Sequence, residues 1–114
     1  METNTVYNKL DDRIKSILNH TRGWLVGNSI ADILEGKEPN DFDIIVPDTS
    51  RYNAMVRSLT TDYSFKINNY GGIKIDTGDF TLDIWTEELD HFLLTANRFT
   101  YGFNFYRRIL LKSL

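Results

Sequence analysis

The sequence predicts an α+β fold in which helices pack on one mixed β-sheet. In the first half of the chain, apolar residues recur at helical spacing and are interrupted by two short continuous apolar runs, at 24–26 and 42–46. Between residues 65 and 84 the apolar residues instead alternate with polar ones, as in half-buried strands. The 114 residues show no repeat or linker, so we expect a single domain, residues 1–114.

The composition excludes several classes of function. There is no cysteine, which excludes a disulfide framework, a thiol nucleophile and a zinc site built on sulfur. Sixteen acidic residues against thirteen basic ones give a net charge of −3, which argues against a strongly basic nucleic-acid module. No apolar run approaches the roughly 20 residues of a membrane span, and the N-terminal segment lacks a basic-then-apolar leader. We expect a cytoplasmic protein with no membrane partner.

The first elements are a helix and a buried strand. Apolar residues from Val6 to His20 predict one helix with a buried face, preceded by a frayed segment at 1–5. Gly23 is expected to end that helix. The run at 24–26 is typical of a buried strand.

A short helix and a second strand follow. Asn28 or Ser29 is expected to cap the helix, and Gly36 to end it. Residues 37–40 predict a turn, and 42–46 a strand, so that the chain opens in a βαβ-like manner.

A third helix is predicted at 51–59, with Asp48, Thr49 or Ser50 as its cap. Half-buried antiparallel strands are predicted around 65–67, 73–75 and 80–84. They are separated by glycine turns.

The C-terminal segment favours a helix at 87–96 and a final helix from about 103 to 114. From residue 97 onward it holds aromatic residues and cations but no acid. The aromatics are expected to complete the core, while basic residues interleaved with aromatics are also typical of single-stranded nucleic-acid binding. The cations of this segment are Arg98, Arg107, Arg108 and Lys112.

Segment 24–46 carries the pattern with the most chemical content. A buried strand ends at Gly27 and a helix begins at once, which leaves backbone N–H groups free to bind an anion such as phosphate. Asp41 and Asp43 stand two residues apart on a strand, so they project to the same face about 7 Å apart. Paired carboxylates without histidine or cysteine favour Mg²⁺ or Mn²⁺ over zinc. A metal-bound nucleoside triphosphate would satisfy both sites.

On these residues the segment resembles the nucleotidyltransferase superfamily, which has the DNA polymerase beta-like palm, and is most similar to the head domain of CCA-adding enzymes and bacterial poly(A) polymerases. Gly27 matches the glycine after the first strand of the family pattern, and Asn28 or Ser29 the following Gly/Ser position. Asp41 and Asp43 match the metal-binding pair.

The resemblance implies a nucleotidyltransferase-like palm and a third carboxylate on a later strand. Asp83 is the best candidate, ahead of Asp76 and Asp79. It also implies transfer of a nucleoside monophosphate from an NTP to a hydroxyl acceptor. Two Mg²⁺ ions, or Mn²⁺, would bind between Asp41, Asp43 and Asp83. Gly27, Asn28, Ser29 and Lys37 would contact the nucleotide phosphates.

Two departures from the family pattern support an alternative. Ala31 stands where the family has arginine before the helix acid, here Asp32, and Asn28 stands at a Gly/Ser position. Lys37, Lys66 or Lys74 are the candidates to restore the missing cation. The alternative is a catalytically degenerate module that binds a protein partner, as an antitoxin-like or regulatory subunit. The acceptor stays open between RNA, protein and a small molecule, and the short chain leads us to expect a partner, a homodimer or a very small acceptor.

Overall fold

The computed structural model describes residues 2–68, 71–89 and 111–112. Within those ranges, no helix has the length and apolar character needed to cross a membrane. The elements are α1 (Glu2–Asn8), α2 (Asp12–Thr21), β1 (Trp24–Val26), α3 (Asn28–Leu34), β2 (Asp41–Val46), α4 (Thr49–Asp62), β3 (Ser64–Ile67), β4 (Ile73–Asp76), β5 (Thr81–Thr86) and β6 (Leu111–Lys112).

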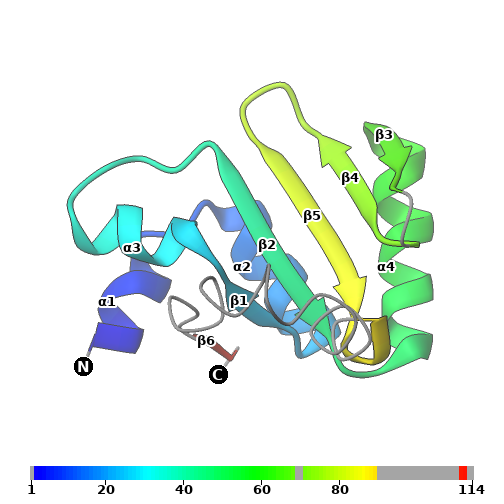
Figure 1. Ribbon diagram of the computed structural model, residues 1–114, viewed down its shortest axis with the longest axis horizontal. Helices are drawn as coiled ribbons and strands as arrows, with labels where there is room; N and C mark the ends of the chain where they lie inside the picture. The colour runs from blue at the N-terminus through cyan, green and yellow to red at the C-terminus, as the bar shows by residue number, and fades with distance from the viewer. Residues whose placement is uncertain (1, 69–70, 90–110, 113–114) are drawn as a thin grey trace, which may run out of the picture.

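The strands form one mixed sheet in the order β3-β4-β5-β2-β1-β6 (Figure 1). β2 and β5 pair in parallel, and every other neighbouring pair is antiparallel. The predicted α+β class with a single mixed sheet is therefore confirmed.

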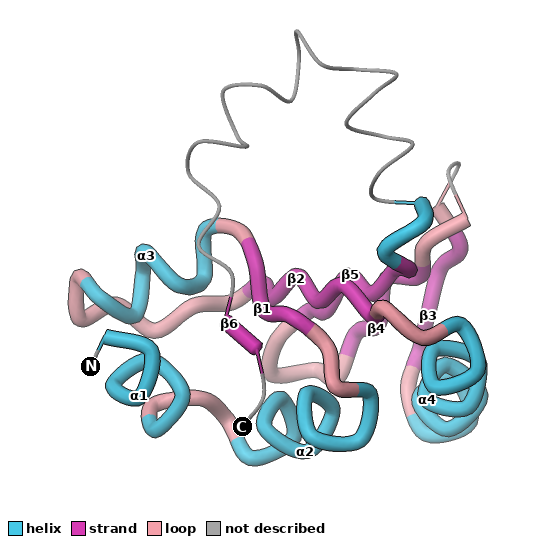
Figure 2. Tube along the Cα trace, turned by 90° about the horizontal axis from the view of Figure 1, so that it is seen from below, coloured by secondary structure: helices cyan, strands magenta, loops and turns pink. Residues whose placement is uncertain are grey.

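Helices cover one face of this sheet. Figure 2 shows α1, α2 and α4 on the same side of the strands. The apolar faces of α2 and α4 meet the inward residues of the strands there and form the hydrophobic core. The strand residues of that core are Leu25, Phe42, Ile44, Val46, Ile73, Ile75, Leu82 and Ile84.

The first helical segment is two helices rather than the single predicted one. α1 begins at Glu2, where a frayed end was expected, and the chain breaks before α2. Asp11 causes the break, because its carboxylate accepts a hydrogen bond from the backbone N–H of Arg13 and so caps α2. Leu10 is still buried, but it lies in the connection between the helices.

The glycines that flank β1 act differently from the prediction. α2 ends at Thr21, and its C-cap Arg22 adopts the left-handed conformation (φ 54°), so Gly23 is not the left-handed residue. Gly23 is needed for close packing, since a Cβ there would lie 3.0 Å from the carbonyl oxygen of Ile45. The residue that caps α3 is Gly27, and neither Asn28 nor Ser29 does so.

The βαβ-like opening is wrong. β1 and β2 are antiparallel, with Leu25 opposite Ile44. α3 and the turn after it carry the chain out and back, as the connection of a wide hairpin (Figure 1). The parallel partner of β2 is β5, which the chain reaches only after α4, β3 and β4.

The antiparallel meander of β3, β4 and β5 is confirmed. β4 and β5 show the expected alternation of buried and less buried residues. β3 does not, because it forms the edge of the sheet while α4 packs on β2, β4 and β5. Phe65 and Ile67 are consequently 47% and 69% exposed.

The C-terminal predictions are tested only in part. Residues 87–89 are helical, and the hydroxyl of Thr86 accepts a hydrogen bond from the backbone N–H of Leu89. The rest of the helix at 87–96 lies outside the described residues, as do Arg98, Arg107 and Arg108. The final helix is wrong at 111–112, because these residues form β6 and pair with β1.

Candidate functional site

The predicted acidic residues lie on the sheet face opposite the core. Along β2, Phe42 and Ile44 point into the core, so Asp41 and Asp43 project from the other face. Along β5 the same alternation places Asp83 opposite to the buried Leu82 and Ile84.

The parallel pairing of β2 and β5 brings these carboxylates together. Asp43 and Asp83 are direct register partners, and Asp41 is opposite Thr81. Adjacent strands run about 4.8 Å apart, so Asp43 and Asp83 are neighbours on one surface. Neither weaker candidate is a register partner of Asp43 or Asp83, although Asp76 shares their sheet face, opposite Thr81. Asp79 forms an ion pair of 3.0 Å with Arg13 of α2, and Asp76 stands at the end of β4.

The carboxylates are engaged with neighbouring groups. The Lys74 Nζ lies 3.4 Å from Oδ2 of Asp83, and Asp41 accepts a hydrogen bond from the hydroxyl of Thr81. In the part of the chain that the structure describes, no three acidic or histidine side chains lie close enough together to hold a metal ion. The oxygen donors and their shared face suit a divalent cation, and the Lys74 ammonium beside Asp83 would compete with that cation for the carboxylate.

Gly27 brings the start of α3 against Asp43. Its backbone angles, φ 84° and ψ −160°, belong to a region that is essentially restricted to glycine. A Cβ on Gly27 would stand 2.6 Å from Oδ2 of Asp43. The sequence predicted a turn here, but this close approach depends on the pairing of β1 with β2, which spacing alone does not reveal.

Ser29 is the most unusual polar residue beside this turn. It is 1% exposed, and its hydroxyl has no hydrogen-bond partner within the described ranges. A buried hydroxyl without a partner costs free energy, so the first turn of α3 holds an unused donor one residue from the exposed Asn28.

The structure does not bring Lys37 to the carboxylates. It follows α3 at the end away from Gly27 (Figure 1), and its Nζ pairs with Glu35 at 3.0 Å. That hydrogen bond raises the pKa of Lys37. Lys66 lies opposite Lys74 on the exposed strand β3. Of the three candidate lysines, Lys74 is the one in contact with a predicted site residue.

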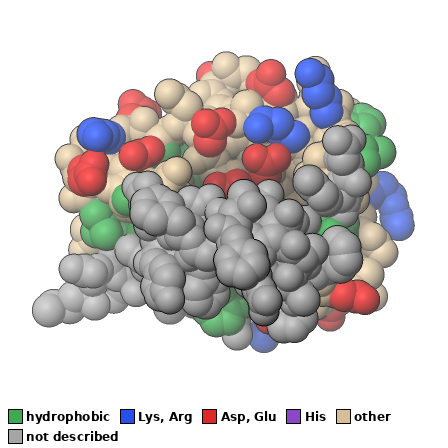
Figure 3. All heavy atoms as spheres, in the orientation of Figure 1, with side chains coloured by type: hydrophobic (Ala, Val, Ile, Leu, Met, Phe, Trp, Pro, Cys, Tyr) green, Lys and Arg blue, Asp and Glu red, His purple; other side chains and the backbone are tan. Residues whose placement is uncertain are grey.

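The charged groups of this face are visible together in Figure 3, where acidic side chains gather near the middle of the molecule with a basic side chain beside them.

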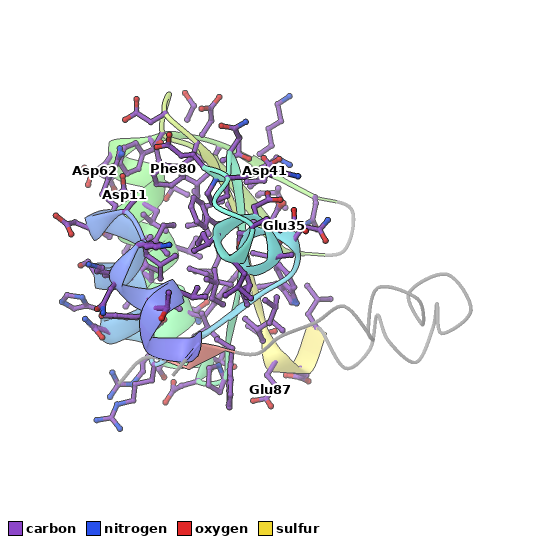
Figure 4. All side chains as sticks on the ribbon, turned by 90° about the vertical axis from the view of Figure 1, so that its left-hand side faces the viewer. Asp11, Glu35, Asp41, Asp62, Phe80 and Glu87 are labelled. Carbon is purple, nitrogen blue, oxygen red and sulfur yellow. The ribbon has the colours of Figure 1, made fainter. Side chains whose placement is uncertain are left out.

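The helix-covered face is different. A groove of about 590 Å³ runs between α2 and α4, and its lining includes Arg13, His20, Arg51 and core residues but none of the predicted site residues. Figure 4 shows Asp11 and Asp62 on the helix side of the sheet and Asp41 on the opposite side.

Comparison with known proteins gives matches among solved structures. No protein-family model matches the chain, and no curated protein does. A CCA-adding enzyme in complex with ATP aligns with a TM-score of 0.60 and 18% identity, over 96% of this chain and 30% of that one. A CCA-adding enzyme with CTP gives 0.58 and 17%, with the same coverage. The Thermotoga maritima CCA-adding enzyme complexed with tRNA gives 0.51 and 17%, over 73% of this chain and 23% of that one.

These matches establish the fold. The chain shares the fold of the matched part of the CCA-adding enzymes, the family that segment 24–46 resembles. It spans less than a third of the length of those enzymes.

Proposed function

We propose that the chain is a Mg²⁺-dependent nucleotidyltransferase that transfers a nucleoside monophosphate from an NTP to a hydroxyl acceptor. The observation that carries the proposal is the register pairing of Asp43 with Asp83, directly beside the positive-φ turn at Gly27. The fold of the CCA-adding enzymes, which have been seen with ATP and CTP, supports it.

The carboxylate face would supply the reaction centre. Asp41, Asp43 and Asp83 would hold Mg²⁺, with Mn²⁺ as a substitute, since all three offer hard oxygen ligands. When bound, the metal ions would favour deprotonation of the acceptor hydroxyl and neutralise charge on the departing pyrophosphate. The acceptor oxygen forms a bond to the α-phosphorus, and the bond from that phosphorus to the β-phosphate oxygen breaks. Asp83 either takes the acceptor proton as general base or serves as a ligand alone.

The start of α3 would hold the β- and γ-phosphates. Its first backbone N–H groups have no partner within the helix. The buried hydroxyl of Ser29, unpartnered within the described residues, is a further donor at this end. The acceptor class stays open between RNA, protein and a small molecule.

Calorimetric titration with NTPs tests the proposal. The wild type is expected to bind at least one NTP in the presence of Mg²⁺ and much more weakly in EDTA. Asp43→Asn should reduce the Mg²⁺-dependent affinity by tenfold or more, because one ligand charge is lost. Asp62→Asn is the matched control: it also removes one carboxylate, but on the helix side of the sheet (Figure 4). Absence of Mg²⁺-dependent binding in the wild type contradicts the proposal.

A second candidate function is a degenerate nucleotidyltransferase-fold module that binds a protein partner. Two features favour it. Lys74 is in contact with Asp83, a proposed metal ligand, and Ala31 stands where the family pattern has an arginine. Under this alternative the protein purifies with a stoichiometric partner, and the Asp41→Ala/Asp43→Ala double variant retains that partner. Loss of a measurable transfer activity in the double variant would count against it.

A further inference from the structure

Four neighbouring strands, β3, β4, β5 and β2, place four charged residues side by side across the sheet. Lys66 on β3 is opposite Lys74 on β4, Lys74 is opposite Asp83 on β5, and Asp83 is opposite Asp43 on β2. Two cations are thus followed by two carboxylates, all on the face away from the core.

The position of Lys74 within this row explains its contact. Like charges directly opposite each other are destabilising, whereas opposite charges attract. Lys74 has a lysine on one side and Asp83 on the other, and its Nζ lies 3.4 Å from the Asp83 carboxylate. The two side chains are 47% and 29% exposed, and pairs in such surroundings contribute little to stability. The contact can therefore open readily.

We propose that Lys74 is a displaceable counter-ion of the reaction centre, a role that rests on the proposed function. Lys74 holds Asp83 while the divalent ion is absent and gives up this carboxylate when the ion binds. The released ammonium then stands beside the site as a free cation and contacts the polyphosphate of the nucleotide.

The proposal predicts opposite effects on metal and nucleotide. Without nucleotide, Lys74 competes with the divalent ion for Asp83 and repels it. A unit charge about 5 Å from a divalent ion changes its affinity by roughly 15-fold at the dielectric constant of water, and salt reduces this to several-fold. With nucleotide, the same ammonium attracts the phosphates. A residue with a purely structural role would weaken both kinds of binding.

Mn²⁺ titration followed by electron paramagnetic resonance tests this. Lys74→Gln should bind Mn²⁺ alone about three- to tenfold more tightly than the wild type and should bind Mn²⁺–ATP several-fold more weakly. Lys66→Gln, the matched control one strand further from Asp83, should change Mn²⁺ affinity less than twofold. Lys74→Arg keeps the charge and should retain the wild-type affinity for Mn²⁺ alone.

A double-mutant cycle tests whether Lys74 acts on Mn²⁺ binding through Asp83. In an Asp83→Asn background, Lys74→Gln should no longer tighten Mn²⁺ binding to the same extent, because the competed carboxylate is gone. Unchanged or weaker Mn²⁺ affinity in Lys74→Gln, with a wild type that binds Mn²⁺, overturns the role of Lys74 and leaves the proposed function standing. A correctly folded wild type that binds no Mn²⁺ overturns both.

Discussion

Gly27 adopts φ 84° and ψ −160° directly beside Asp43, and this single residue lets the helix start approach the carboxylate. Alanine in this backbone region is strained by about 1–3 kcal/mol. Its Cβ would also push the Asp43 carboxylate away. We therefore expect Gly27→Ala to lower the free energy of unfolding by that amount and to weaken Mg²⁺-dependent NTP binding, as measured by urea denaturation and calorimetry.

Gly78 offers a matched control for this prediction. It also has a positive φ, 93°, but a Cβ there meets nothing within 4 Å. Gly78→Ala should lose stability through backbone strain while nucleotide binding stays unchanged. Equal loss of binding in both variants would show that Gly27 has no special relation to the site.

Asp11 gives a prediction of pH dependence. The hydrogen bond from the Arg13 side chain, with help from the Arg13 backbone N–H, lowers the pKa of Asp11 against the opposing effect of burial. Because the folded-state pKa is below the unfolded value, the ionised carboxylate stabilises the fold above about pH 4, and this contribution is lost as pH falls through the lowered pKa. Asparagine keeps the cap without the charge.

The wild type should accordingly melt about 1–4 °C above Asp11→Asn at pH 7. Scanning calorimetry from pH 7 to pH 2 should show this gap closing below about pH 4. A gap that stays constant, or widens on acidification, would assign the effect to something other than ionisation of Asp11.

Single residues also show what spacing can and cannot predict. The common face of Asp41 and Asp43 follows from strand alternation alone, so the sequence predicted it correctly. The contact of Lys74 with Asp83 and the buried state of Ser29 were missed, because they depend on strand register and helix placement.

Among the described residues, the C-cap of α2 is where a residue other than glycine has a positive φ. Arg22 holds the left-handed position that usually carries glycine. Arg22→Gly relieves this strain but makes the unfolded chain more flexible. We expect a net gain on the order of 0.5–1 kcal/mol in the free energy of unfolding, measured by urea denaturation.

Arg57→Gly provides the contrasting control. Arg57 is exposed within the interior of α4, where glycine costs about 1 kcal/mol. The same substitution should thus stabilise at one position and destabilise at the other. A loss at Arg22 as large as that at Arg57 would mean that the left-handed conformation carries no strain.

Element types were predicted better than their directions. Helical and strand periods placed α4, β2, β4 and β5 correctly. The antiparallel pairing of β1 with β2 was missed, since a short apolar run carries no information about strand direction. The exposed face of β3 was missed for a similar reason: alternation predicts two faces but not whether an element covers one of them.

The two faces of the sheet carry different kinds of residue. Helices α1, α2 and α4 and the hydrophobic core occupy one face (Figure 2). Asp41, Asp43 and Asp83 project from the other face, as the alternation along β2 and β5 shows. The sequence predicted the single mixed sheet. It did not predict the parallel pairing of β2 with β5, which brings the carboxylates together, because that pairing joins strands far apart in the chain. Local spacing identified Asp41 and Asp43, and the family resemblance implied Asp83, but neither showed that Asp43 and Asp83 are register partners.

A crystal structure with Mn²⁺ and a non-hydrolysable NTP analogue is the most direct test of the proposed nucleotidyltransferase site. We expect an anomalous peak between the carboxylates of Asp43 and Asp83, the analogue's phosphates at the start of α3, and Lys74 moved away from Asp83. Under saturating conditions, an analogue bound elsewhere, or no ion beside an intact Lys74–Asp83 contact, would contradict the assignment.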